Sequence, residues 1–202
     1  MMNYFAMDVK WNSYENIFKN KKVAFFNPTF FFPSAKKGFD IVIVNPPYVN
    51  VENLNDETKE YLFDNYKTCK GRTDIYIAFI ETTMKLLKEN GLFSFIIPYP
   101  YTNQNYGALS RKMLIEEYFI KEIVDTSEYY VFESAVVKNI ILSVVKTQTE
   151  QQTTIKIAKS QNDFFENSFK TSLINQSKFL ELKDYRLETK DISRHRAVCS
   201  GQ

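Results

Sequence analysis

The chain has 202 residues, of which 44% are hydrophobic and 16% aromatic, so it can bury one core of ordinary size. Its 26 basic and 24 acidic side chains nearly balance, which argues against a polybasic arm but does not exclude a local nucleic-acid site. One histidine, His195, and two distant cysteines, Cys69 and Cys199, disfavour a Ser-His-Asp triad, a disulfide framework and a metal site. We therefore expect no bound metal.

Glycine is scarce, and the five residues are scattered at Gly38, Gly71, Gly91, Gly107 and Gly201. A phosphate-binding loop or a G-x-G-x-x-G turn needs clustered glycines, so neither is expected. The longest apolar runs are far shorter than a membrane span, and no export signal is visible at the N-terminus. These features favour a cytoplasmic protein that does not contact a membrane.

Apolar runs of strand type alternate with helical patterns, which is the signature of an α/β fold with right-handed crossovers. The apolar run FDIVIV is typical of a strand buried on both faces of a sheet. The clearest helix has Thr73 or Asp74 as N-cap and Gly91 just beyond its end. The predicted elements are a strand at 39–44, helices at 54–66 and 73–90, a strand at 92–98, a helix at 106–118, and strands at 120–125 and 136–146. A last edge strand is expected at 153–158.

The tetrapeptide Asn45-Pro46-Pro47-Tyr48 follows the first predicted strand, at the sheet edge where open α/β sheets bind ligands. Its groups suit the exocyclic amino group of adenine, a poor nucleophile because the ring withdraws its lone pair. The side-chain oxygen of Asn45 and the carbonyl of Pro46 could accept the two N–H bonds and favour a tetrahedral nitrogen.

The other features of this tetrapeptide fit the same chemistry. The two prolines fix φ and remove backbone donors, so the turn presents carbonyls rigidly. Tyr48 would offer a ring on which an extruded base stacks. No acid or base is required at neutral pH, which agrees with a chain that has one histidine. The alternative is a Pro-Pro turn that simply ends a strand.

Several segments, taken in order over roughly residues 11–147, resemble the adenine-specific N-6 DNA methyltransferases of the gamma class, from type I and type IIG restriction-modification systems. FDIVIVNPPYV is similar to their catalytic motif IV, and TDIYIAFIETTMKLLKENG to their D-[IL]-Y helix. The later stretch EIVDTSEYYVFESAVVKNIILSV is similar to their motif VIII region. The resemblance implies the C-terminal half, with its closing β-hairpin, of a Rossmann-like, class I S-adenosylmethionine-dependent methyltransferase sheet.

The resemblance also assigns roles to residues. Asn45, Pro46, Pro47 and Tyr48 would be catalytic, and Asn45 would also face the cofactor. In the family, an aromatic at the position of Phe132 contacts the flipped adenine. Phe132 and Tyr48 would therefore bind an adenine that has been flipped out of double-stranded DNA. The alternative for Phe132 is an ordinary packing aromatic.

Asp74 and Tyr76 match the D-x-Y segment that lines the cofactor side in the family. The resemblance therefore makes them candidate ligands for S-adenosylmethionine. The alternatives are a helix N-cap for Asp74 and a packing tyrosine for Tyr76.

One departure concerns the cofactor. The family holds S-adenosylmethionine with a D-P-x-x-G-x-G turn after its first strand, and none of the 44 residues before Asn45 forms such a turn. The strand at 39–44 would also leave an apolar edge without its family neighbour. We therefore expect a separate N-terminal methyltransferase half or partner subunit.

These observations predict three segments: a lead-in at 1–38, a partial catalytic core at 39–147, and at 148–202 an edge strand and tail that begin a truncated specificity region. The expected function is methylation of the amino group of a flipped adenine within a restriction-modification system. Two alternatives stay open: a catalytically inactive DNA-binding or interaction remnant, and a protein-glutamine methyltransferase, which also holds a planar amide with N-P-P-Y.

Overall fold

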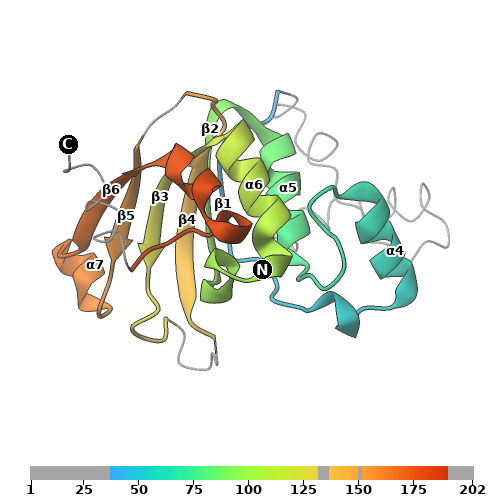
Figure 1. Ribbon diagram of the computed structural model, residues 1–202, viewed down its shortest axis with the longest axis horizontal. Coiled ribbons are helices and arrows are strands. Elements are labelled where there is room, and N and C mark those ends of the chain that lie inside the picture. Colours follow the sequence, from blue (N-terminus) through green and yellow to red (C-terminus); the bar gives the residue numbers. More distant parts are fainter. Residues whose placement is uncertain (1–36, 132–136, 150–151, 191–202) are drawn as a thin grey trace, which may run out of the picture. The chain divides into compact units, whose positions relative to one another are not determined.

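A six-stranded sheet organises the part of the chain that the computed structural model describes, which is residues 37–131, 137–149 and 152–190. The strand order is β1-β2-β4-β3-β5-β6. The strands are β1 (Phe39–Val44), β2 (Leu87–Pro98), β3 (Phe119–Asp125), β4 (Asn139–Val145), β5 (Gln152–Ile157) and β6 (Lys170–Asn175). The helices are α4 (Asp56–Asn65), α5 (Tyr76–Leu86), α6 (Ala108–Glu117) and α7 (Asn162–Glu166), with short 3-10 helices η2 (Val51–Asn53), η3 (Tyr99–Thr102), η4 (Asn105–Gly107), η5 (Gln176–Glu181) and η6 (Lys183–Tyr185) (Figure 1).

The sheet mixes parallel and antiparallel pairs. β1 runs parallel to β2, and β4 lies between β2 and β3 and is antiparallel to both. The pair β3–β4 is the closing hairpin that the sequence predicts, so the expected α/β sheet is confirmed. None of the helices among the described residues has the length and apolar character needed to cross a bilayer.

The helix predicted over 73–90 is wrong at both ends. α5 begins at Tyr76 without a side-chain cap and ends at Leu86, and residues 87–90 already belong to β2. The reason is a β-bulge in β2, where Asn90 has a left-handed φ of 62° and the register with β1 shifts. A Cβ at Gly91 would lie 3.0 Å from the carbonyl oxygen of Phe39, so this glycine permits the close approach of β1.

The C-terminal part of the sheet also differs from expectation. The strand predicted as an edge at 153–158 corresponds to β5, which pairs with β3 on one side and β6 on the other. β6 is not predicted from the sequence, because its largely polar composition, KTSLIN, gives no apolar alternation. The edge strand on this side is therefore β6.

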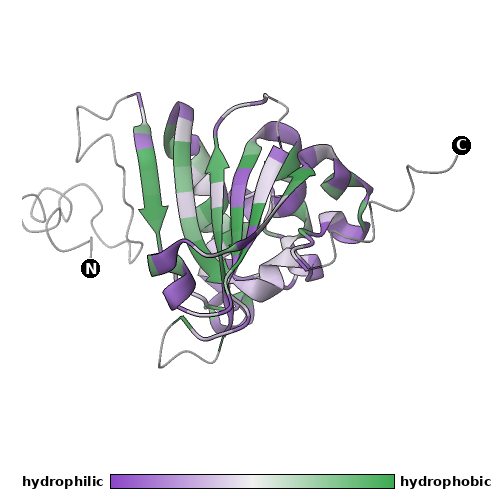
Figure 2. Ribbon diagram, turned by 90° about the vertical axis from the view of Figure 1, so that its left-hand side faces the viewer, coloured by the Kyte–Doolittle hydropathy of each residue, from purple (hydrophilic) through white to green (hydrophobic). Residues whose placement is uncertain are grey.

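Alternate side chains of the central strands build the core. Phe93, Phe95 and Ile97 on β2 are completely buried, and their neighbours on β4, Ile140 and Leu142, are buried with them. Helices α5 and α6 lie across this face of the sheet (Figure 1). The strands carry most of the hydrophobic colour, whereas much of the helix surface is hydrophilic (Figure 2). Burial of these strand side chains against the two helices stabilises the sheet.

The opposite face of the sheet is less covered. On it, Leu92 and Ser94 of β2 are only half-buried. Their partners on β1, Ile41 and Ile43, are 59% and 69% exposed. A parallel pair of strands normally has both faces covered, so this apolar surface is unusual for a strand of this composition.

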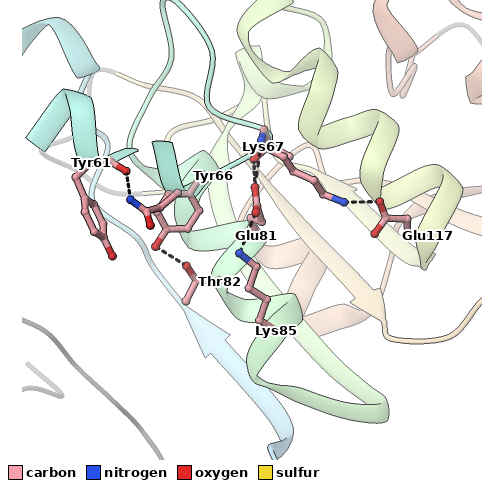
Figure 3. A network of polar contacts seen from close by, with 9 residues as sticks. Tyr61, Tyr66, Lys67, Glu81, Thr82, Lys85 and Glu117 are labelled. Carbon is pink, nitrogen blue, oxygen red and sulfur yellow. Dashed lines mark hydrogen bonds and ion pairs between the residues drawn. The ribbon is translucent and has the colours of Figure 1, made fainter. Parts of the chain in front are cut away.

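A buried carboxylate fixes the segment between α4 and α5 (Figure 3). Glu81 accepts hydrogen bonds from the backbone N and the hydroxyl of Thr68, at 3.1 and 2.8 Å, and pairs with Lys85 at 3.0 Å. Burial raises the pKa of Glu81, but the hydrogen bonds from Lys85 and Thr68 outweigh it, so the net pKa is lowered. Lys67 reaches α6 through Glu117 at 2.6 Å. This segment leads directly to Asp74.

A completely buried arginine, Arg111 on α6, joins two distant loops. Its guanidinium donates to the carbonyls of Tyr101 and Gln104, at 2.5 and 2.9 Å, and to those of Asp184 and Tyr185, at 2.6 and 3.0 Å. Burial lowers its pKa. Four carbonyls therefore satisfy the hydrogen-bond donors of this buried charge. In return, the arginine fixes the loop that follows β2.

We predict that Arg111→Met lowers the free energy of unfolding by about 2 to 4 kcal/mol, because it leaves buried carbonyls without a donor. Urea denaturation measures this. The exposed Arg72→Met is the matched control and should leave the unfolding midpoint nearly unchanged. Equal effects of the two substitutions would contradict the role of Arg111.

Candidate functional site

Four segments meet at one edge of the sheet. The carboxyl ends of the parallel strands β1 and β2 point the same way, and the antiparallel strand β4 begins there. This edge is where open α/β sheets bind their ligands. The segments are Asn45 to Tyr48 after β1, residues 99–107 after β2, residues 73–76 before and at the start of α5, and Asn139 at the start of β4.

The tetrapeptide is anchored on both sides. β1 precedes it, and after it the carbonyl of Val49 accepts the amide of Ile75 at 2.9 Å, while the amide of Val51 donates to Thr73, also at 2.9 Å. Within it, Asn45 and Pro47 are exposed, Pro46 is buried and Tyr48 is half-buried. The exposed amide of Asn45 therefore lies on a segment that two prolines and these backbone hydrogen bonds constrain.

The hydroxyl of Tyr48 lies among three polar groups. It is 2.8 Å from the carbonyl oxygen of Ile96, 3.1 Å from Oδ1 of Asn45 and 3.3 Å from Nδ2 of Asn139. Burial raises the pKa of Tyr48 to about 12. The hydroxyl stays protonated at neutral pH and holds the ring in one place.

Behind Tyr48 lies a cluster of tyrosines centred on Tyr76. The ring of Tyr76 meets those of Tyr48, Tyr101 and Tyr106 edge to face, with centroids 6.0, 6.1 and 6.4 Å apart. The hydroxyls of Tyr76 and Tyr106 are 2.8 Å apart. Tyr76 is completely buried, and this burial raises its pKa well above the ordinary value. The cluster is a stiff aromatic support for Tyr48.

Asp74 is half-buried beside this cluster. Burial raises the pKa of its carboxyl, and a hydrogen bond from Tyr106 opposes that shift. It does not cap α5, whose N-cap is Ile75. Asp74 instead bridges to Asn50 through its backbone.

The structure thus brings together the predicted residues Asn45, Pro46, Tyr48, Asp74 and Tyr76 at one edge. Their roles toward substrate and cofactor stay predictions. Tyr76 has no exposed surface and its hydroxyl is hydrogen-bonded to that of Tyr106, so among these five predicted residues Asp74 and Asn45 are the two that offer an accessible polar side chain to a cofactor. The described glycines stand singly, so these residues fit one wall of an S-adenosylmethionine site and lack its glycine turn. Phe132 lies outside the described residues.

Sequence reasoning missed three residues of this edge: Tyr101, Tyr106 and Asn139. The two tyrosines follow the second predicted strand within PYPYTNQNY, where aromatic density was a usable signal. Asn139 gave none, because one polar residue at the start of an apolar strand is an ordinary strand boundary.

Comparison with known proteins shows the family to which the chain belongs. Residues 3–132 match the family described as Eco57I restriction-modification methylase. Type II methyltransferase M.BstVI of Geobacillus stearothermophilus is 32% identical over 118 residues, which are 58% of this chain and 21% of that protein. Type II restriction enzyme and methyltransferase RM.Eco57I of Escherichia coli is 25% identical over 156 residues, 76% of this chain and 15% of that protein. The chain therefore spans about a fifth or less of these relatives.

A solved structure shares the fold. The methyltransferase subunit of a type I restriction-modification system from Streptococcus thermophilus superposes with a TM-score of 0.58 at 18% identity. The match covers 76% of this chain and 38% of that subunit. The sheet therefore has the fold of that methyltransferase subunit, which confirms the predicted class of fold.

We predict that the Asp74 carboxyl titrates above the ordinary aspartate range, because burial disfavours its charged form. Tyr106→Phe should raise this pKa further, since it removes a hydrogen bond that stabilises the carboxylate. Carboxyl carbon NMR shifts recorded against pH measure both values. A lower pKa in Tyr106→Phe would contradict the interaction.

Proposed function

Because the chain belongs to the Eco57I restriction-modification methylase family, we propose that it is the base-activating part of an adenine-specific DNA methyltransferase. The observation that carries the proposal is the exposed Asn45 amide on a rigid Pro-Pro turn, at the ligand-binding edge of a methyltransferase sheet. The enzyme would belong to a restriction-modification system and act in the cytoplasm.

The reaction requires an adenine that has left the DNA stack. The flipped base stacks on the ring of Tyr48, and the edge-to-face contact with Tyr76 restricts the movement of that ring. The family resemblance also assigns Phe132, which lies outside the described residues, to contact with the flipped adenine. Stacking of this kind contributes about 1 to 3 kcal/mol per base.

The amino group is activated by two acceptors. Oδ1 of Asn45 and the carbonyl of Pro46 accept its two hydrogens, which returns electron density to the nitrogen and favours a tetrahedral geometry. S-adenosylmethionine, when bound, would supply an electrophilic methyl group from its sulfonium sulfur, and the amino nitrogen would lose one of its two protons to solvent as it gains that group. Asn45 and Asp74 would face this cofactor, with Tyr76 packed behind them.

The cofactor site is completed by a further polypeptide segment or subunit. β1 is the outermost strand of the sheet among the described residues, yet its sequence is that of a central strand. Ile41 and Ile43 of this strand expose apolar side chains on one face of the sheet. A methyltransferase half that contributes a strand beside β1 and helices over this face would bury both.

We predict that Asn45→Ala lowers methyl transfer to adenine-containing duplex DNA by at least about 100-fold, since it removes one of two acceptors. The assay follows radioactive methyl from S-adenosylmethionine, with the chain supplemented by the N-terminal part of M.BstVI. Asn53→Ala, also exposed, is the matched control. Equal rates for wild type and Asn45→Ala would reject the site, and no transfer by the wild type would favour an inactive remnant.

We predict that Ile43→Lys weakens association of the chain with that N-terminal part by more than about 10-fold, because burying an isoleucine contributes about 1.5 to 3 kcal/mol. Calorimetric titration measures the affinity. Leu173→Lys, at the opposite edge and 57% exposed, should have no effect. If both substitutions act equally, the β1 surface is not the docking site.

A further inference from the structure

The hydroxyl of Tyr48 has more neighbours than it has hydrogens. It carries one hydrogen and two lone pairs. Two acceptors approach it, the carbonyl of Ile96 at 2.8 Å and Oδ1 of Asn45 at 3.1 Å, and one donor, Nδ2 of Asn139 at 3.3 Å. The single hydrogen cannot serve both acceptors fully.

The carbonyl of Ile96 is the preferred acceptor of that hydrogen. It is the nearer acceptor, and being a backbone carbonyl it cannot become a donor. The amide of Asn45 can turn by 180° about its last bond and present Nδ2 instead. The hydroxyl then donates to Ile96 and accepts from the amides of both Asn45 and Asn139, so that each hydrogen and lone pair is used.

We propose that Asn139 is a positioning residue that sets the orientation of the Asn45 amide through the hydroxyl of Tyr48. By donating to this oxygen, Asn139 blocks the rotamer in which the hydroxyl hydrogen points toward β4. The hydrogen is directed to Ile96, and Nδ2 of Asn45 faces Tyr48. Oδ1 of Asn45 then faces the place of the substrate.

Within the part of the chain that the structure describes, the buried side chain of Asn139 makes a single hydrogen bond, to Tyr48. It has no exposed surface, and its strand NIILSVV is otherwise apolar but for one serine. The backbone carbonyl of Asn139 accepts from the hydroxyl of Thr126 at 2.7 Å, which holds the residue in place. Its own Oδ1 has no hydrogen-bond partner, so the contact to Tyr48 is its one side-chain hydrogen bond among the described residues. A buried unpaired oxygen costs stability, which makes an asparagine here a poor choice for packing alone.

The orientation matters for the chemistry, and here the inference rests on the proposed function. An Asn45 amide with Nδ2 toward the substrate would set a donor against the amino hydrogens of adenine. An amide with Oδ1 toward the substrate offers an acceptor. Asn139 therefore keeps the amide in the productive orientation before the base arrives, which is preorganisation of the site.

The first test uses the full chain alone and needs no DNA. Side-chain amide NMR of the 15N-labelled protein, with Asn45 assigned by its loss in Asn45→Asp, should show one Nδ2 hydrogen shifted downfield and protected from exchange. In Tyr48→Phe both hydrogens should move to the position of an exposed amide such as Asn53. If the Asn45 signal already resembles Asn53 and does not respond to Tyr48→Phe, the inference is overturned.

The second test is a double-mutant cycle in the methyl-transfer assay. Tyr48→Phe keeps the stacking ring, and it and Asn139→Ala should each lower kcat by about 10-fold with a smaller change in KM. The double variant should be no slower than Tyr48→Phe, because Asn139 acts only through that hydroxyl. Ser143→Ala, which removes another hydroxyl from β4, is the control with unchanged kcat.

Additive losses in the cycle would show that Asn139 acts through general packing and would overturn the inference. Loss of activity in Asn45→Ala with full activity in Tyr48→Phe would overturn it while leaving the proposed function intact. Full activity in Asn45→Ala would instead reject the proposed function. The NMR result on the chain alone still decides the amide orientation in that case.

Discussion

The parallel pairing of β1 with β2 is the constraint on which the rest of the site depends. It brings the end of β1, with Asn45, to the same edge as the loop after β2, with Tyr101 and Tyr106. The pairing itself needs the bulge at Asn90 and the close approach at Gly91. Chemistry at this edge therefore begins with how two backbones pack, several residues away from the reacting groups.

The sheet is unequally covered, and this asymmetry explains the proposed need for a further segment. One face is closed by α5 and α6 and is rich in completely buried aromatic and aliphatic side chains. The other keeps Ile41 and Ile43 exposed next to half-buried residues of β2. The chain matches 21% of M.BstVI and 15% of RM.Eco57I, so each of these relatives has a long further sequence outside the matched part.

Local signals in the sequence are enough to predict the strand before Asn45, its Pro-Pro segment and the strands that correspond to β3 and β4, whereas the closing hairpin follows from the family resemblance. The predicted helix extends beyond the end of α5, because residues 87–90 continue its helical sequence pattern. Pairing with β1 makes these residues part of a strand instead. The roles of Arg111 and Asn139 cannot be predicted from the sequence, since their hydrogen-bond partners lie up to 91 residues away along the chain. Such partnerships depend on tertiary geometry, which no periodicity encodes.

The central claim is that Asn45 activates the amino group of adenine. Mass spectrometry of the nucleosides from duplex DNA tests it most directly, after the DNA is treated with the chain, the N-terminal part of M.BstVI and S-adenosylmethionine. The account predicts N6-methyladenine with the wild-type chain and none above background with Asn45→Ala. Methylation of cytosine, of a protein glutamine in place of DNA, or of adenine to the same extent by Asn45→Ala would contradict it.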